Sequence, residues 1–472
     1  MQPPSPTTPQ STRSRTSSAR SARGAVQWLS VCFFLLFSGF QAAQGLQSSL
    51  NKVFGLLNLA VLYSTFAFCL FQAPALVTFL ERKTGGLPWV MLIGGSCYAL
   101  SIFLTAIPST ETGVEWVVLG SFAALGIGAA LLWTAEAEYL GRCAIQAARR
   151  TGGSEAVGEA TADLNGIFFG NFQFAGLAGT GLSAFLLGTE GRGVLFIILG
   201  FLAILGSVGF LGLPNIAGGR DLSVAPSYRA TLSVSITANF LPLLPLIFSN
   251  GLMLGFFVGP FLEEIGAPIL GPSWVPVLLC VFFLVNSIST KFWGKMMAGK
   301  RTNEAMQLLY ETENDISKSL RFYSVICGSL ICFFGVLFLM LPIPAAYKES
   351  KSGWEPTGLN RSESMEIGLR VLLISLVGIF AFADSFFESQ LPAAVQASFQ
   401  NGGQGLAANA AYKLWQTLGT ATQLSIALVI GWRQQIVVLF SFTFLGVWAL
   451  FYGARSVQER SPETVDELGV RI

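Results

Sequence analysis

The sequence predicts an all-α polytopic membrane protein with twelve transmembrane helices in two pseudo-symmetric six-helix halves. Of its 472 residues, 52% are hydrophobic and 11% are Asp, Glu, Lys or Arg, whereas soluble proteins carry about 25% charge. The mean hydropathy of +0.61 agrees with this composition. Apolar runs of about 20 residues, long enough to cross a bilayer, recur along the chain. Composition therefore excludes a soluble domain and confines charge to loops and to a few positions inside spans.

The runs are separated by Gly, Pro and polar residues, which end helices at the membrane surface. Such breaks follow the second, third, fifth, sixth and tenth runs, at 84–88, 108–110, 188–193, 214–215 and 402–403. The twelve spans are predicted at 25–45, 54–76, 88–107, 115–139, 163–188, 193–213, 239–261, 272–292, 322–342, 367–391, 406–431 and 434–454.

The distribution of Lys and Arg predicts the orientation, because these residues remain in cytoplasmic loops. A cytoplasmic N-terminus places twenty of them inside and seven outside, with Lys413 inside a span. Both termini are therefore expected in the cytoplasm, and the long outer loop 343–366 contains a glycosylation sequon at Asn360. The sequence does not indicate which membrane holds the protein.

The predicted organisation follows from these spans. It comprises a disordered cytoplasmic N-tail at 1–24, a six-helix half at 25–213, a cytoplasmic linker at 214–238, a second half at 239–454 and a cytoplasmic C-tail at 455–472. The N-tail contains Pro, Ser, Thr and Arg and no acid, a composition typical of disorder. The same composition is typical of transit peptides, so a targeting role remains an alternative.

The chain contains no histidine, and this excludes Ser-His-Asp triads, HExxH zinc sites and histidine proton relays. Acid–base chemistry would fall to carboxylates, Lys, Tyr or Cys. The seven cysteines lie in or beside apolar runs, as small buried side chains do. We therefore expect no enzyme activity, no cofactor and no metal site.

The two predicted halves carry polar residues at corresponding places. The fourth and tenth spans each end with two acids, and the fifth and eleventh each begin with Asn followed by Gln seven or eight residues later. These residues are Glu136, Glu138, Asp384, Glu388, Asn165, Gln173, Asn409 and Gln416. Duplicated six-helix halves around a polar cavity describe the major facilitator architecture.

Several motifs carry a family resemblance. They are LQSSLN (46–51), AVLYSTFAF (60–68), ALGIGAALLWTAEAEYL (124–140), NGIFFGNFQ (165–173), DSFFESQ (384–390) and AAYKLWQTLG (410–419). Over about 30–454 the chain resembles the uncoordinated-ninety-three-like family of the major facilitator superfamily. The resemblance implies a twelve-helix facilitator fold and roles divided among potassium-channel regulation, receptor trafficking and transport. The loop FLERKTGGLP (79–88) departs from the superfamily's G-x-x-x-D-R-x-G-R loop, since it lacks the aspartate that Glu81 would replace.

Charged residues inside spans are costly, so they mark interior partners or pathways. Asp384 and Glu388, at i and i+4, share one face of the tenth span, and Lys413 lies at the depth of Asp384 in the eleventh. They form either a structural ion pair or a coupling site that exchanges a proton or a cation. Glu136 and Glu138 point about 200° apart, so one is expected inward and the other towards headgroups or Arg142.

Polar and aromatic residues in six spans are candidates to line a central cavity, or else to join helices by hydrogen bonds. They are Gln41, Gln44, Trp133, Glu136, Asn165, Gln173, Asn250, Gln390, Asn409 and Gln416. Such a lining would suit a small polar or zwitterionic solute or a hydrated monovalent cation.

Two functions remain open. The first is a secondary carrier of a small polar solute or cation that rocks its halves around the cavity. The second is a non-transporting regulatory or trafficking partner of another membrane protein. The expected partners are the lipid bilayer, a small solute or cation and, in the second case, a membrane protein, but no nucleic acid.

Overall fold

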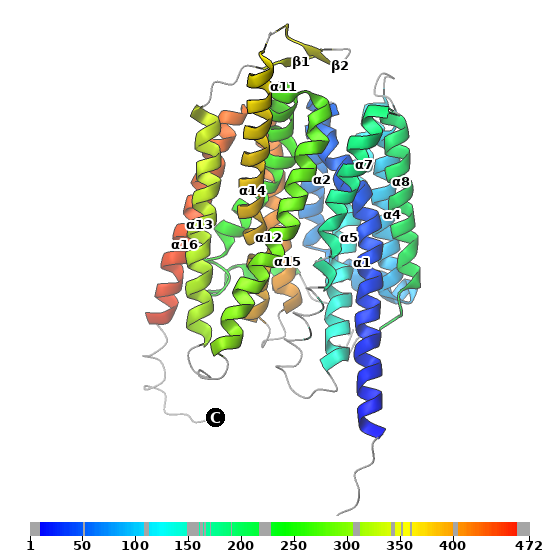
Figure 1. Ribbon diagram of the computed structural model, residues 1–472. Helices are drawn as coiled ribbons and strands as arrows, with labels where there is room; N and C mark the ends of the chain where they lie inside the picture. The colour runs from blue at the N-terminus through cyan, green and yellow to red at the C-terminus, as the bar shows by residue number, and fades with distance from the viewer. Residues whose placement is uncertain are drawn as a thin grey trace, which may run out of the picture.

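The structure is a computed structural model of the chain. It describes residues 10–50, 52–107, 113–148, 160, 164, 167–169, 171–189, 191–216, 228–304, 312–340, 345–350, 353–358, 361–399 and 405–459. These residues form a bundle of long helices with a small β-hairpin at one end (Figure 1). The expected all-α class is therefore confirmed.

Seven helices are described in the first part of the bundle. They are α1 (Gln10–Leu50), α2 (Lys52–Leu70), α3 (Ala73–Thr84), α4 (Leu87–Thr105), α5 (Val114–Ala148), α7 (Phe174–Thr189) and α8 (Arg192–Gly209), which a short 3-10 turn, η1 (Phe210–Gly212), extends.

The second part follows from residue 228. Its helices are α9 (Tyr228–Ser235), α10 (Leu244–Phe256), η2 (Phe257–Gly266), α11 (Ala267–Leu270), η3 (Pro272–Trp274), α12 (Val275–Glu304), α13 (Thr312–Met340), α14 (Glu363–Phe399), α15 (Gly405–Ala427) and α16 (Trp432–Glu459). The hairpin consists of β1 (Tyr347–Ser350) and β2 (Gly353–Pro356), paired antiparallel with Tyr347 opposite Pro356. The N–H of Ala346 donates to the carbonyl of Pro268 at 2.8 Å, which ties the hairpin to α11.

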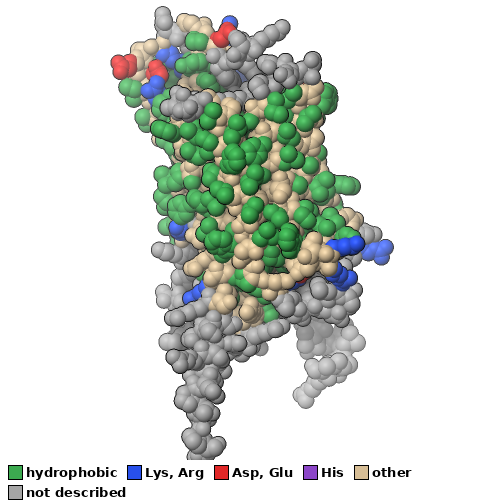
Figure 2. Space-filling view, turned by 90° about the vertical axis from the view of Figure 1, so that its right-hand side faces the viewer, with side chains coloured by type: hydrophobic (Ala, Val, Ile, Leu, Met, Phe, Trp, Pro, Cys, Tyr) green, Lys and Arg blue, Asp and Glu red, His purple; other side chains and the backbone are tan. Residues whose placement is uncertain are grey.

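Nine helices among the described residues are long and apolar enough to cross a membrane, or ten if one bent pair counts as a single span. The predicted count of twelve is thus not established, although α7 and α15 also run within the bundle (Figure 1). Helix α15 is polar on its inner face, and α7 is only 16 residues long. Figure 2 shows hydrophobic side chains over the middle of one face and charged side chains towards its two ends, as a bilayer requires.

Three predicted boundaries differ from the structure. The second predicted span, 54–76, is broken between α2 and α3, which meet at 77°, because Pro74 cannot continue a helix with regular hydrogen bonds. Helix α1 begins at Gln10, so residues 10–24 are helical rather than disordered. Extending an existing helix adds a hydrogen bond for each residue, without a new nucleation cost.

The third difference concerns the seventh span, predicted at 239–261. In the structure it runs from Leu244 to Leu270 through the π-helix η2, which contains Pro260. Proline has no backbone N–H to donate, and the wider turns of a π-helix accommodate the missing hydrogen bond. This extension carries Glu263 into the interior, where it is 1% exposed.

Helices from the two parts of the chain meet in matching pairs. Helix α2 packs against α15, α7 packs against α12, and α1 packs against η2. Helix α1 begins and α16 ends at the same end of the bundle (Figure 1). The division into halves at 214–238 remains a prediction, and residues 217–227 of that linker lie outside the described part.

Candidate functional site

Two carboxylates one helical turn apart lie inside the second part of the bundle. Asp384 and Glu388 are on α14, and Asp384 is 3% exposed. The Nδ2 of Asn286, on α12, donates to Asp384 Oδ2 and to Glu388 Oε2, both at 3.3 Å. The Nδ2 of Asn250, on α10, donates to Asp384 Oδ1 at 3.2 Å. One amide therefore bridges two acids, and neither acid forms an ion pair with a residue of the described ranges.

Lys413, on α15, is joined to Asp384 through two amides. Its Nζ donates to Gln416 Oε1 at 3.0 Å, and Gln416 Nε2 donates to Asn250 Oδ1 at 2.8 Å. Asn250 in turn donates to Asp384, which completes the chain of hydrogen bonds. The residues that the sequence places at one depth are thus connected, but they are not in contact.

Glycines allow α10 and α15 to approach closely enough for this chain to form. A Cβ on Gly251 would lie well inside contact distance of the carbonyl oxygen of Gln416. A Cβ on Gly419 would do the same to the carbonyl oxygen of Phe248. Because the backbones touch at these points, the short amide of Asn250 reaches Gln416 directly.

The ammonium of Lys413 faces the first part of the bundle. It lies 4.9 Å from the ring centroid of Trp133, on α5, and 5.7 Å from that of Tyr412. Glu388 and Glu136 are the acids whose charges act on it. The predicted ion pair between Asp384 and Lys413 is thus not formed in this structure, because the lysine stem turns to Gln416 and the indole.

Glu136 and Glu138 have different surroundings. Glu136 is 4% exposed and makes no hydrogen bond with any described residue. Glu138 binds Arg142 Nε at 3.0 Å, one turn further along α5. This difference agrees with their expected separation around the helix.

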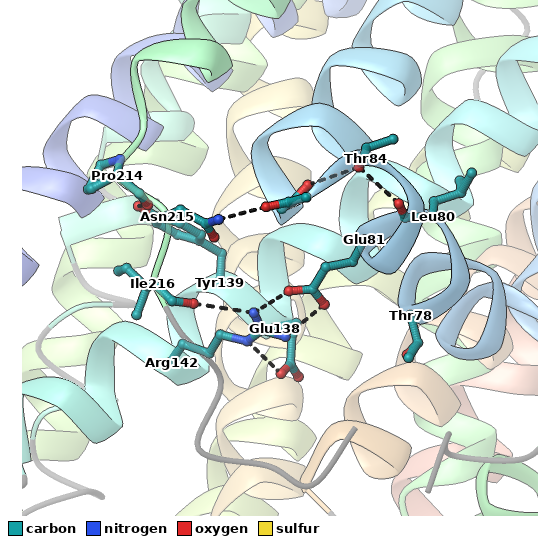
Figure 3. A network of polar contacts seen from close by, with 12 residues as sticks. Thr78, Leu80, Glu81, Thr84, Glu138, Tyr139, Arg142, Pro214, Asn215 and Ile216 are labelled. Atoms are coloured by element: carbon teal, nitrogen blue, oxygen red, sulfur yellow. Dashed lines mark hydrogen bonds and ion pairs between the residues drawn. The ribbon is translucent and has the colours of Figure 1, made fainter. Parts of the chain in front are cut away.

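A second polar network surrounds Arg142 (Figure 3). Its Nη1 and Nη2 donate to the two carboxylate oxygens of Glu81, on α3, at 2.5 and 2.9 Å, and its Nη1 also donates to the carbonyl of Ile216 at 3.3 Å. Asn215 Nδ2 donates to the carbonyl of Gly85 at 2.7 Å. The loop that lacks the superfamily aspartate is therefore held to α5 and to the segment after α8, with Glu81 as the acid.

The remaining predicted site residues are spread over several helices. Gln44 Nε2 donates to Tyr63 OH at 2.6 Å, and Gln390 Nε2 donates to the hydroxyl of the neighbouring Ser389 at 3.1 Å. Gln41 Oε1 is buried without a hydrogen-bond partner in the described part of the chain, and Gln173 is buried near Glu388. Asn409 makes no side-chain hydrogen bond with a described residue. Asn165 and Asn360 lie outside the described residues.

Sequence reasoning missed three residues of this interior. Asn286 is an amide within the eighth predicted span, so the rule that selected the other amides would have found it. Tyr63 lies in a quoted motif but was assigned no role. Glu263 was missed because the seventh span was expected to end two residues before it.

The fold and its buried charges define a multi-pass integral membrane protein. Over 92% of this chain and 99% of the other, the structure is similar to that of the nucleoside transporter NupG, with a TM-score of 0.58 and 14% sequence identity. This likeness confirms the major facilitator fold.

The sequence comparisons point to one group of relatives. The model of the family described as ion channel regulatory protein UNC-93 matches residues 47–267. UNC93-like protein MFSD11 of Xenopus laevis is 24% identical over 92% of this chain and 96% of its own length. UNC93-like protein 3 of Arabidopsis thaliana is 26% identical over 58% of this chain, and the match spans 60% of that relative. The chain is therefore similar to UNC-93-like proteins, over part of its length by the family model and over most of it by the Xenopus relative.

Proposed function

We propose that the protein is a secondary carrier driven by a proton or a monovalent cation, with Asp384 and Glu388 as its coupling site. The observation that carries this proposal is the sharing of Asn286 by two acids that have no ion-pair partner among the described residues. Two like charges in a low-dielectric interior repel each other, so binding of a proton or a cation between them is favourable. A purely structural site would place the ammonium of Lys413 against these acids.

The packing of the bundle supports movement around this site. Helices α2 and α15, α7 and α12, and α1 and η2 are among the pairs that join the two parts of the chain. In the proposed cycle the two parts rock about these contacts, and the carboxylates are charged again once the coupling ion leaves. A small polar or zwitterionic solute or a cation is the proposed cargo, between residues that include Gln41, Asn165, Asn250 and Asn409.

The experiment uses the purified protein in liposomes that contain no other protein. An entrapped pH dye and an imposed potential report proton or cation movement when small amino acids, amines or alkali salts are added. Wild type should move charge or protons with at least one of these solutes. Asp384→Asn and Glu388→Gln should abolish movement against a gradient, whereas the control Glu366→Gln, at an exposed acid beside Arg370, should not. A wild type that is inactive with every solute, or a fully active double neutral variant, would overturn the carrier.

A second function has one specific observation in its favour. The matching family model is described as an ion channel regulatory protein. In that case the protein binds and regulates another membrane protein, and its buried polar residues serve only to stabilise its own fold. Currents from a co-expressed channel should then change with this protein present, while the liposomes above stay silent.

A further inference from the structure

The side chain of Lys413 occupies surroundings that are built to hold a cation. Its ammonium lies over the indole face of Trp133, where the negative ring quadrupole attracts positive charge. The amide oxygen of Gln416 accepts one of its three N–H donors. No other described residue accepts a hydrogen bond from it.

The aromatic platform is fixed independently of the lysine. The indole of Trp133 packs against Phe33, Phe37 and Phe172, with ring centroids 5.5, 5.3 and 5.5 Å away. These contacts hold the ring in place on α5, whichever cation lies on its free face. The platform is thus preorganised rather than moulded by Lys413.

Two acids from different helices complete the surroundings. Glu136, on α5, and Glu388, on α14, act on the ammonium by charge, and neither forms an ion pair with it. Glu136 is 96% buried and makes no hydrogen bond within the described ranges. A buried carboxylate without donors is costly, and a mobile cation beside it lowers that cost.

We propose that Trp133, Gln416, Glu136 and Glu388 form a binding site for a primary ammonium ion, and that Lys413 fills this site as a tethered ligand. A free ammonium ion takes the same place when the lysine side chain moves away. The site stands on the position of the ammonium over Trp133 and on its hydrogen bond to Gln416. The further statement that the carried solute is an organic ammonium ion rests on the proposed carrier function.

Removal of the tether makes the site measurable. In Lys413→Ala the missing atoms are three carbons and the nitrogen, which n-propylammonium supplies. Thermal unfolding of the full-length variant in detergent, at constant ionic strength, should therefore show a saturable rise in Tm with n-propylammonium. The rise should be smaller with methylammonium, and sodium, potassium and tetramethylammonium, which have no N–H donors, should give none.

Two variants provide matched controls. Lys291, on α12, also lies over an aromatic ring, that of Phe174 at 4.5 Å, but it is exposed and lacks these acids. Lys291→Ala should show no response to n-propylammonium. Trp133→Leu added to Lys413→Ala should reduce the response at least tenfold in half-saturating concentration, because the ring face is lost.

The outcomes separate the two proposals. Equal stabilisation by tetramethylammonium, or no stabilisation beyond that of Lys291→Ala, would overturn the ammonium site. If Lys413→Ala does not accumulate, Lys413→Met lacks only the nitrogen, so ammonium should raise its Tm and the larger n-propylammonium should not; the opposite order would also overturn the site. Stabilisation without any flux in liposomes would overturn the carrier and leave the site standing. Flux in liposomes without stabilisation by n-propylammonium would overturn the ammonium site and leave the carrier standing.

Discussion

Lys413 and Asp384 lie at the two ends of a chain of three hydrogen bonds that passes through the amides of Gln416 and Asn250. The chain connects α15, α10 and α14. Its central member is Asn250, which uses both its oxygen and its nitrogen. Loss of that one side chain should therefore affect both ends.

Asn250→Ala should lower the free energy of unfolding by about 1–3 kcal/mol, since it leaves buried polar atoms of Gln416 and Asp384 without partners. Thermal or denaturant unfolding in detergent measures the change. Asn409→Ala is the control, because Asn409 makes no side-chain hydrogen bond with a described residue and should cost little. Equal effects of the two variants would show that the chain does not stabilise the fold.

The indirect connection predicts weak coupling between its charged ends. Breaking a buried ion pair in direct contact typically costs about 3–5 kcal/mol. A double-mutant cycle of Asp384→Asn and Lys413→Met should give an interaction energy well below this, because the two groups do not touch. A value of that size, with each single variant rescued by the other, would show that the pair closes in solution.

Glu81→Gln should destabilise the loop before α4 more than Glu138→Gln does. Glu81 binds Arg142 with both oxygens, from a different helix, and bonds to a charged group are worth about 1.5–3 kcal/mol. The bond between Glu138 and Arg142 lies within α5, where such pairs give about 0.3–0.5 kcal/mol. Limited proteolysis of the 79–88 loop and unfolding both report the difference. The reverse order would contradict the contacts shown in Figure 3.

Gly251→Ala and Gly419→Ala should be strongly destabilising, because each new methyl group would strike a backbone oxygen across the contact between α10 and α15. Gly368→Ala, on α14, meets nothing within 4 Å and should be neutral or stabilising, as alanine favours helices by about 1 kcal/mol. The yield of folded protein and its Tm are the measurements. Wild-type Tm values for the first two variants would show that the helices are further apart than the structure has them.

Tags at residues 1 and 472 should be labelled only after permeabilisation, and a tag near Ser352 should be labelled on intact cells or vesicles. This expectation follows from the twenty-to-seven distribution of Lys and Arg. Helix α1 begins and α16 ends at one end of the bundle, which fits an even number of crossings (Figure 1). Opposite labelling of the two termini would contradict it.

The fold class and several of the buried polar residues could be predicted from the sequence. Which of these residues contact each other could not. Hydropathy and spacing determine the depth of Asp384 and Lys413, but not the direction in which each helix turns its side chains. The two residues were therefore expected to pair, whereas close contact between α10 and α15 brings Asn250 and Gln416 between them. That contact depends on Gly251 and Gly419, whose partners are more than 160 residues away in the sequence.

Local backbone irregularities explain the other differences. Pro74 breaks the predicted span 54–76, although that span contains no charged residue. The π-helix around Pro260 continues the seventh span beyond its predicted end at 261. Both prolines are visible in the sequence. Whether proline ends, bends or widens a helix depends on its neighbours in the fold. The predicted seventh span therefore stops short of Glu263, which is buried in the structure.

The two amides between Lys413 and Asp384 point the same way, each with its oxygen towards the lysine and its nitrogen towards the aspartate. An amide does not release a proton at neutral pH. The two amides therefore orient each other through hydrogen bonds but do not pass a proton between Lys413 and Asp384. The negative charge of Asp384 fixes the orientation of Asn250, and neutralising it would leave that amide free to turn over. Gln416 would then lose the oxygen to which it donates, and Lys413 would lose its fixed partner. A change of charge at Asp384 on α14 would therefore rotate side chains on α15.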